Sequence, residues 1–322
     1  MGSTPFSGTK SFLSSMIALP RSEKPATTDS KRFPKAFSVF FVALLAVVAA
    51  AVSARAQQHH PQAPKELRLY VFDCGVVNGL DPAGFNFKKG ELANTELAVP
   101  CYLIVDPMGT LMWDVGAIPD RAFKEDHAPV NLAFFYSTKT LKSQLAEIGY
   151  APSDITYLAL SHYHGDHVAN SNEFASATWL VRAAERDALF AQKPSRIPSE
   201  YTDPTEYSEL RKSKTILIAT DEYDVFGDGK AIIKFAPGHT PGHQVLVLKL
   251  AKTGNVMLSG DLYHYPEELK LDRTPTPEFS RDESLASRAM IQDYLKRTNT
   301  QLWIEHDFVA NAKLKKSPKY YD

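Results

Sequence analysis

The stretch that decides the fold is SHYHGDH, residues 161–167, in which three histidines and an aspartate occupy six positions. Residues 155–160, just before it, form a short apolar run that includes β-branched side chains, the pattern of a buried strand. Alternate side chains of an extended segment point the same way, so His162 and His164 can reach one ion from the strand end. The sequence therefore predicts a metal site where this strand ends.

The second half of the stretch indicates a second ion. Gly165 allows the chain to turn directly after the first two histidines. The turn directs Asp166 and His167 toward a point close to the first ion but separate from it. A centre with two ions is therefore expected rather than a centre with one.

Ligands from other parts of the chain are needed, because two histidines do not complete the coordination shell of a zinc ion. Three downstream segments offer them, and each follows a strand-like run. Side chains that end neighbouring strands meet at one edge of a sheet, where sites are commonly built. The candidate ligands in these segments are His239, Asp261 and His306.

In this order and spacing the residues resemble the metallo-β-lactamase superfamily, over roughly residues 66–310. The resemblance implies an α/β fold, the αββα sandwich of two stacked mixed sheets flanked by helices, where periodicity alone leaves α/β and α+β open. It also implies two divalent metal ions. Zinc is the first expectation, and the same ligand types suit iron, manganese or cobalt. The implied ligands are His162, His164 and His239 for the first ion, Asp166, His167 and His306 for the second, and Asp261 as a bridge between them.

Smaller motifs around these ligands are similar to the N-acyl homoserine lactonase branch. They are Val99–Ile104, Trp113–Gly116 and Gly260–His264. The resemblance implies that a hydroxide held between the two ions opens the lactone ring of N-acyl homoserine lactones. Asp166 is expected to orient this nucleophile and to pass a proton to the leaving group. The expected partner is a small lactone or a related ester.

One position departs from that branch. Its members commonly place a tyrosine three residues after the bridging aspartate, where this chain has His264, with Tyr263 one position earlier. Either side chain can donate a hydrogen bond to a developing oxyanion, so both are candidate catalytic residues beside Asp166. The plain alternatives are a packed aromatic at Tyr263 and a surface histidine at His264.

Other functions stay open at this point. A β-lactamase or a glyoxalase II-like thioesterase can use the same fold, although β-lactamases usually lack the bridging aspartate. A non-catalytic periplasmic metal-binding protein can keep the same ligands without turnover. Carriers of that kind tend to have His-rich tracts, and only His59-His60 hints at one.

The N-terminal part of the chain has the layout of a signal peptide. Basic residues precede an uncharged run, residues 36–54, and the run is followed by a small-x-small cleavage site that ends at Ala56. The predicted organisation is a leader over residues 1–56, a linker over 57–65 and a hydrolase domain over 66–322. A periplasmic or secreted protein follows, and an uncleaved membrane anchor is the alternative.

Charge and cysteine content narrow the partners. Residues 1–56 hold seven of the 36 Lys and Arg and two of the 37 Asp and Glu, which leaves a net charge of −6 on the rest. Nucleic acid is therefore not an expected partner. Cys74 and Cys101 end neighbouring strand candidates, and both a disulfide and two buried thiols stay open. The oligomeric state is also open, a homodimer included.

Two further features bear on the site. The long segment between Val77 and Pro100 is predicted to be a flap that offers an apolar surface to the substrate, with a plain mobile connection as the alternative. The resemblance implies that Asp114 supports the metal ligands from outside. His243 is interpreted as a turn or supporting residue, because His239 already matches the ligand position.

Overall fold

The strand predicted before the histidine stretch is β6 (Tyr157–Ala159) in the computed structural model, which describes residues 62–125, 127–191 and 203–322. It pairs in parallel with β3 (Gly109–Trp113) and β7 (Thr178–Val181). Parallel strands of this kind are buried on both faces, which fits the apolar sequence of β6. The histidines thus follow the carboxyl end of an interior strand, as predicted, and the predicted leader lies outside the described residues.

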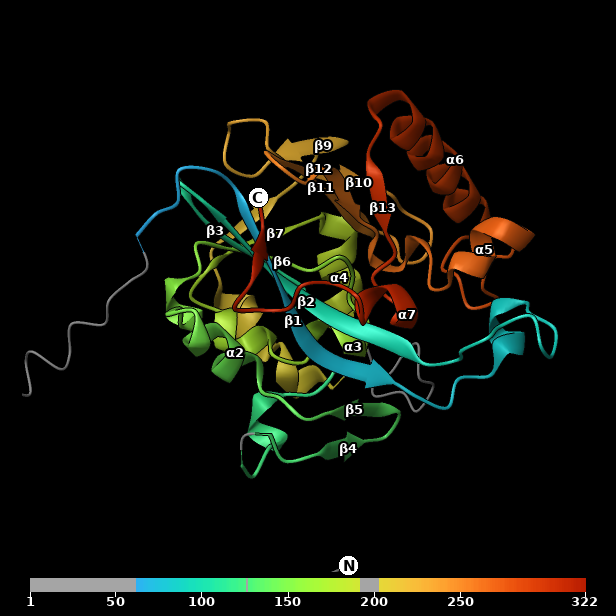
Figure 1. Cartoon of the computed structure of the whole chain (residues 1–322), viewed down its shortest axis with the longest axis horizontal. Coiled ribbons are helices and arrows are strands. Elements are labelled where there is room, and N and C mark those ends of the chain that lie inside the picture. Colours follow the sequence, from blue (N-terminus) through green and yellow to red (C-terminus); the bar gives the residue numbers. More distant parts are fainter. Residues whose placement is uncertain (1–61, 126, 192–202) are drawn as a thin grey trace, which may run out of the picture. The chain divides into compact units, whose positions relative to one another are not determined.

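The larger sheet has nine strands within the described ranges (Figure 1). Their order is β4-β5-β1-β2-β3-β6-β7-β8, and β14 pairs with β1. The sheet is mixed, because the parallel strands around β6 continue into antiparallel pairs from β3 onward. The remaining bounds are β1 (Arg68–Val77), β2 (Leu97–Asp106), β4 (Val130–Leu132), β5 (Phe135–Ser137), β8 (Thr215–Leu217) and β14 (Tyr320–Tyr321).

The smaller sheet has five strands in the part of the chain that the structure describes, in the order β13-β12-β11-β10-β9. Its strands pair antiparallel, apart from the parallel pair of β12 and β13. The antiparallel strands alternate in direction, so successive loops lie at opposite ends of the strands. The bounds are β9 (Glu222–Asp224), β10 (Ala231–Phe235), β11 (Gln244–Leu250), β12 (Gly254–Leu258) and β13 (Gln301–Trp303).

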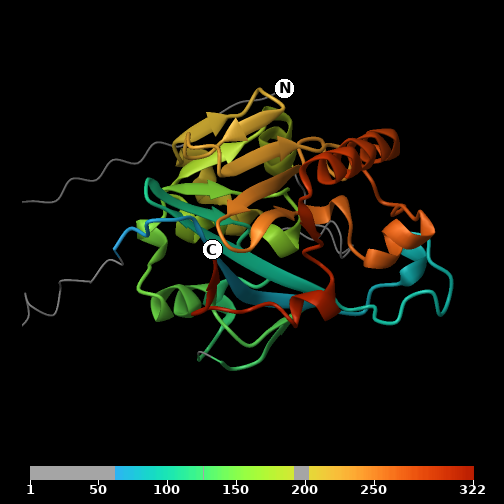
Figure 2. The same cartoon turned by 45° about the horizontal axis from the view of Figure 1, so that its top comes forward.

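Three apolar clusters show how the layers stack. One cluster lies between the sheets and joins Trp113 of the larger sheet to Leu246 of the smaller one. A second covers the outer face of the larger sheet with α2 and α4, and a third covers the smaller sheet with α6. Figure 2 shows α6 beside the five-stranded sheet. The αββα sandwich is confirmed, and each fully buried Leu or Phe in it contributes about 1.5–3 kcal/mol.

The helices begin at capping residues that the sequence supplies. Thr140 Oγ1 accepts a hydrogen bond from Ser143 N at the start of α2, and Ser280 Oγ accepts one from Glu283 N at the start of α6. The α-helices are α2 (Leu141–Glu147), α3 (Gly165–Val168), α4 (Ala183–Ala191), α5 (Pro266–Leu271), α6 (Arg281–Thr298) and α7 (Phe308–Asn311). The 3₁₀ turns are η1 (Pro82–Phe85), η2 (Asp120–Ala122), η3 (Pro152–Asp154), η4 (Ser171–Phe174), η6 (Pro204–Glu206), η7 (Ser208–Lys212) and η8 (Gly260–Leu262).

The segment predicted as a flap between Val77 and Pro100 is shorter than expected. Strand β1 continues through a bulge to Val77, and β2 already begins at Leu97. Pro100 lies inside β2 opposite Asp73, although proline cannot donate to a sheet. The backbone of Asp73 pairs with Gln144 instead: the side-chain oxygen of Gln144 accepts from Asp73 N and its amide donates to Asp73 O, both at 2.9 Å, so Asp73 needs no donor from Pro100. The connection over the site is therefore residues 78–96.

A search of the described helices for one long and apolar enough to span a bilayer finds none.

Candidate metal centre

The histidine stretch is held in place by the end of β6 and by a single helical turn. His162 comes directly after the strand region, and His164 is the residue before α3. Asp166 and His167 lie within α3, so the turn expected at Gly165 is the start of this short helix. All four side chains are buried. The two halves of the stretch therefore present their side chains from a strand end and from a helix.

The other three predicted ligands come from the same edge of the sandwich. His239 lies in the turn between β10 and β11, Asp261 lies in η8 after β12, and His306 follows β13. Their ligand atoms join those of the histidine stretch in two groups, each within 4.8 Å. We call them the four-residue group (His162, His164, His239 and Asp261) and the three-residue group (Asp166, His167 and His306).

Asp261 stands between the two groups. Its Oδ1 lies 3.1 Å from His167 Nε2 and 2.9 Å from His306 Nε2. Its Oδ2 lies 3.5 Å from His162 Nε2 and 3.3 Å from His239 Nε2. Because each carboxylate oxygen faces a different group, the geometry is that of a bridging ligand between two ions.

The polar atoms of the centre fit two divalent cations. Among the described residues, His162 Nε2, His167 Nε2, His306 Nε2 and Asp261 Oδ1 are buried and have no hydrogen-bond partner. Leaving such atoms without a partner costs about 1–3 kcal/mol each. Cations satisfy them together, since imidazole nitrogens and carboxylate oxygens are ordinary ligands of zinc and similar metals.

The charge of Asp261 suits this role. Burial opposes ionisation of the carboxyl group, but the imidazoles of His306, His162 and His167 outweigh burial and hold its pKa well below the usual value. The carboxylate is therefore ionised at neutral pH, which a metal ligand has to be.

Hydrogen bonds from the larger sheet orient the three-residue group. Asp114 Oδ2 lies 2.8 Å from His167 Nδ1, and Asp114 Oδ1 accepts from Ser161 N at 2.6 Å. His306 Nδ1 lies 2.7 Å from the carbonyl oxygen of Ala98 on β2. These contacts turn both Nε2 atoms toward the centre, as outer partners of metal-binding histidines do. The supporting position predicted for Asp114 matches this contact.

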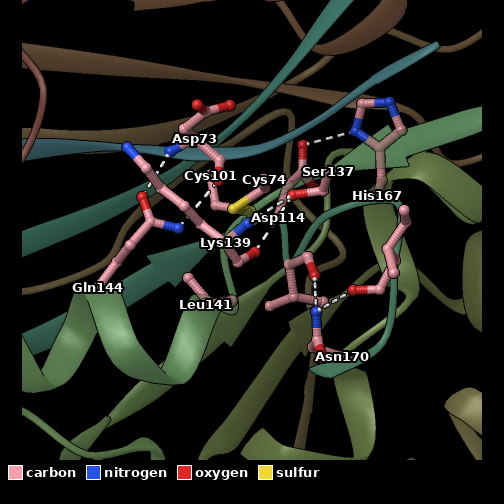
Figure 3. The surroundings of a disulfide bond; sticks show 12 residues. Asp73, Cys74, Cys101, Asp114, Ser137, Lys139, Leu141, Gln144, His167 and Asn170 are labelled. Carbon is pink, nitrogen blue, oxygen red and sulfur yellow. Dashed lines mark hydrogen bonds and ion pairs between the residues drawn. A yellow bond between two sulfur atoms is a disulfide. The ribbon is translucent and has the colours of Figure 1, made fainter. Parts of the chain in front are cut away.

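A disulfide lies directly behind this group (Figure 3). Cys74 of β1 is bonded to Cys101 of β2. Of the two possibilities that the sequence allowed, a disulfide and two buried thiols, the structure has the disulfide. Gly116 packs against it so closely that an added Cβ would come within 2.8 Å of Cys74 Cβ. The same short loop continues from Asp114, and Val115 N donates to His167 O at 2.9 Å. The disulfide therefore packs against the loop of residues 114–116, which holds His167.

Buried acids support the four-residue group. Glu185 of α4 accepts hydrogen bonds from Thr240 Oγ1 at 2.8 Å and from Gly242 N at 2.7 Å, both in the turn directly after His239. A Cβ at Gly242 would overlap Glu185, so this approach requires glycine. Burial raises the pKa of Glu185 to about 7. Glu278 also faces His239, with 3.6 Å between Glu278 Oε2 and His239 Nδ1.

His243 supports Asp261 rather than a metal. Its Nε2 accepts from Asp261 N at 2.9 Å, and its Nδ1 lies 2.9 Å from Ala236 O, to which it donates. Burial lowers the pKa of His243 to about 3, so the ring is neutral and can accept and donate in this way. This arrangement agrees with the supporting role predicted for His243.

The comparison with protein families now identifies the architecture. A model described as the metallo-beta-lactamase superfamily matches residues 94–295, which is more than half of the chain. The chain belongs to this superfamily.

Within the metallo-beta-lactamase superfamily the chain is similar to several lactonases. The N-acyl homoserine lactonase AttM of Azorhizobium caulinodans is 27% identical over 262 residues, covering 80% of this chain and 99% of that protein. The N-acyl homoserine lactonase AiiA of Bacillus thuringiensis subsp. kurstaki is 25% identical, covering 79% of this chain and 98% of that protein. The similarity thus spans nearly the whole length of these relatives.

Solved structures of the superfamily share the fold. An N-acyl homoserine lactone hydrolase with the product N-hexanoyl-L-homoserine at its catalytic metal centre aligns with a TM-score of 0.64 and 22% identity, covering 80% of this chain and 100% of that one. The dizinc quorum-quenching lactonase AidC aligns with a TM-score of 0.60 and 20% identity, covering 80% and 94%. At these identities the structures support the fold alone.

A small cavity opens onto the ligand cluster. Its volume is about 30 Å³. Residues 78–96 form one side of it and lie against α5 in both views (Figures 1 and 2), where Thr276 N donates to Gly84 O and Tyr265 Oη donates to Thr95 O. The cavity is lined by Val77, Leu80, Phe85, Leu97, His164, Asp166, Asp261, His264 and His306.

The structure separates the two remaining catalytic candidates. His264 lines the cavity, with its Nε2 3.1 Å from Asp261 Oδ2, so it is not the surface histidine considered as an alternative. Tyr263 points the other way, into the apolar cluster beneath α6, where Gln292 Nε2 donates to its hydroxyl at 3.4 Å. Tyr263 therefore packs the core, and its contacts with the described residues do not include the centre.

Sequence reasoning missed the buried acids around the cluster. Glu185 and Glu278 lie far along the chain from the turn that carries His239, and no spacing rule connects them to it. Glu268 follows His264 by only four residues, so this pair has a local spacing that the sequence reading did not use. One signal was present, since the two glycines around His239 indicate that another element approaches the turn closely.

Proposed function

We propose that this chain is a metal-dependent lactonase that opens the ring of N-acyl homoserine lactones. The observation that carries the proposal is the position of Asp261, whose two oxygens face two separate groups of buried ligands. A dinuclear centre of this kind favours hydrolysis of a carbonyl compound. Relatives named as N-acyl homoserine lactonases match over nearly their whole length, which supports this substrate class.

Two bound divalent ions would supply Lewis acidity, polarising the carbonyl and making a water nucleophilic near neutral pH. The proton transfer falls to Asp166, which lines the cavity beside both groups. Its carboxylate accepts the proton of the attacking water and returns it to the ring oxygen when the carbon–oxygen bond breaks. The products on the opened chain are one hydroxyl group and one carboxylic acid, which releases its proton to water at neutral pH.

The cavity walls suit an acyl lactone. Val77, Leu80, Phe85 and Leu97 form an apolar side opposite the ligands, which matches the acyl chain of such a substrate. A cavity of about 30 Å³ has room for little more than a water molecule. We propose that residues 78–96 act as a flap that moves outward when a lactone binds.

Zinc is the metal that we propose, because histidine and aspartate ligands suit it and a structural neighbour is named as a dizinc lactonase. Elemental analysis of the isolated protein distinguishes it from iron, manganese and cobalt. We also propose export to the periplasm or the medium. The leader pattern supports export, and so does the disulfide, since disulfides persist in oxidising compartments.

The decisive experiment compares the zinc-loaded protein with Asp166→Asn on homoserine lactones of several acyl lengths. The wild type is expected to open the ring, and the variant to lose about 10²–10⁴-fold in kcat, the range for a general base. Asp187→Asn on the exposed face of α4 is the control and should keep full activity. No ring opening by a protein with two bound metals would reject the substrate.

The same preparations separate the alternatives. Turnover of a chromogenic cephalosporin would indicate a β-lactamase, and turnover of a glutathione thioester would indicate a thioesterase. A carrier would turn over none of these compounds, and Asp166→Asn would then only weaken retention of one ion.

A further inference from the structure

His264 faces the centre without belonging to either ligand group. Its Nε2 lies 3.1 Å from Asp261 Oδ2, yet its ligand atoms lie outside both the four-residue and the three-residue group. The ring forms part of the cavity wall and is 5% exposed. His264 therefore borders the cavity next to Asp261.

The other side of the His264 ring faces a buried carboxylate. His264 Nδ1 lies 3.3 Å from Glu268 Oε1, in the first turn of α5. The same oxygen accepts from His264 N at 3.0 Å and from Tyr265 N at 3.2 Å. One carboxylate oxygen therefore hydrogen-bonds to the backbone of His264 and lies at ion-pair distance from its ring.

Arg288 of α6 completes the arrangement. Its Nη2 donates to Glu268 Oε2 at 2.5 Å, and its Nη1 donates to Arg273 O at 2.6 Å. The guanidinium carbon lies 4.5 Å from the centre of the Tyr263 ring, which places Tyr263 in this supporting layer. The side chains of Glu268 and Arg288 are 0% and 9% exposed.

A buried ion pair is weak evidence for stability alone, because removing two charges from water offsets most of their attraction. Aromatic rings confine His264 from other directions. Phe85 packs against it edge-on at 4.9 Å, and His306 stacks at 5.7 Å between ring centres. The ring thus has little freedom, and its Nδ1 faces Glu268 while its Nε2 faces Asp261.

We propose that Glu268 and Arg288 are positioning residues that act through His264. They hold the imidazole so that Nε2 faces the carbonyl group of the bound lactone, where the reaction changes the charge on oxygen. The reaction-specific part of this inference rests on the proposed function, and the orientation of His264 does not. No cavity-lining residue other than His264 contacts this pair among the described interactions.

A double-mutant cycle tests whether Glu268 acts through His264. The zinc-loaded wild type, Glu268→Gln, His264→Ala and the double variant are compared on N-hexanoyl homoserine lactone. Glu268→Gln is expected to lower kcat about 10–100-fold, the range for an outer partner of a site residue, with little change in KM. In the His264→Ala background the same substitution should have no further effect, because the residue it acts through is gone.

Glu267→Gln is the matched control. It removes one carboxylate from the adjacent position of α5, where Glu267 pairs only loosely with Lys270 at 3.6 Å, and kcat should not change. An equal loss of kcat from Glu268→Gln in both backgrounds would overturn the proposal, since Glu268 would then act on the fold. If Glu268→Gln does not fold, Arg288→Lys replaces it in the cycle and should show the same dependence on His264.

A readout without turnover separates this proposal from the proposed function. The ¹⁵N NMR signals of the His264 ring are expected to shift in zinc-loaded Glu268→Gln and to stay in place in Glu267→Gln. Unshifted signals overturn the positioning role, whether or not the protein hydrolyses lactones. Shifted signals without lactone opening support the positioning role and reject the substrate.

Discussion

The two ligand groups of the centre are held by different means. The three-residue group rests on the larger sheet, through Asp114, a carbonyl of β2 and the disulfide behind the loop. The four-residue group depends on acids from helices and loops, with Glu185 and Glu278 around His239. A covalent link does not respond to pH, whereas a buried carboxylate does. Asp114 is a buried carboxylate as well, so the disulfide is what distinguishes the first group. Loss of the disulfide should therefore affect the three-residue group first, and ionisation of Glu185 should affect the turn that carries His239.

The largest effect is expected from removing the disulfide. Cys74→Ala/Cys101→Ala should lower the free energy of unfolding of the metal-free protein by about 3–4 kcal/mol, because the link closes a loop of some 27 residues. Denaturant unfolding measures this loss. In metal titrations of the folded variant, the ion of the three-residue group should weaken first, since Gly116 and its loop lose their support.

Treatment of the wild type with a dithiol reductant provides the control, because it should reproduce the loss without a substitution. The reductant should leave the double variant unchanged. A loss below about 1 kcal/mol, or equal weakening of both ions, would contradict the different support of the two groups.

The sequence predicted which seven residues would converge, and the reason lies in local geometry. Five of the seven are fixed by short turns at strand ends, where spacing determines direction. The sandwich itself followed from the resemblance. The sequence could not decide whether Cys74 and Cys101 form a disulfide, because the answer depends on strand register. Phe72 pairs with Cys101, so Cys74 lies diagonally on the same face, and the bulge after Asp73 brings the two Cα atoms to 5.8 Å.

The surroundings of the ligands were predicted poorly. Tyr263 and His264 are neighbours in sequence, and the direction of each was settled only by the packing of α5 and α6. The flap was predicted a few residues too long, because the pairing of Leu97 with Val77 of β1 sets the start of β2. Contacts between elements far apart in the chain decide these features, and no local pattern records them.

A smaller effect is expected from Asp114→Asn. The amide keeps the shape of the side chain but loses the charge beside His167 Nδ1, so the ion of the three-residue group should bind about 10–100-fold more weakly. Competition with a chelating dye measures the two affinities separately. Asp106→Asn is the control, since this buried aspartate lies at the far end of β2 and caps Met108 N instead. Equal weakening of both ions would show that the two groups share their support.

The smallest effect is expected from Glu185→Gln, and it should depend on pH. Burial raises the pKa of Glu185 from 4.5 to about 7, so the folded state holds this proton more tightly than the unfolded chain does. The stability that the protonated group contributes is complete below pH 4.5 and is lost as the pH rises through 7. Glutamine does not ionise, so the stability of Glu185→Gln should not follow this titration. Between pH 5 and pH 8 the free energy of unfolding of the metal-free wild type should fall by on the order of 1 kcal/mol relative to the variant. This is less than the full pKa shift implies at about 1.4 kcal/mol per pH unit. Denaturant unfolding at pH 5 and pH 8 measures this difference, with Glu209→Gln at an exposed position as the control. A difference between wild type and Glu185→Gln that is the same at both pH values would contradict this account.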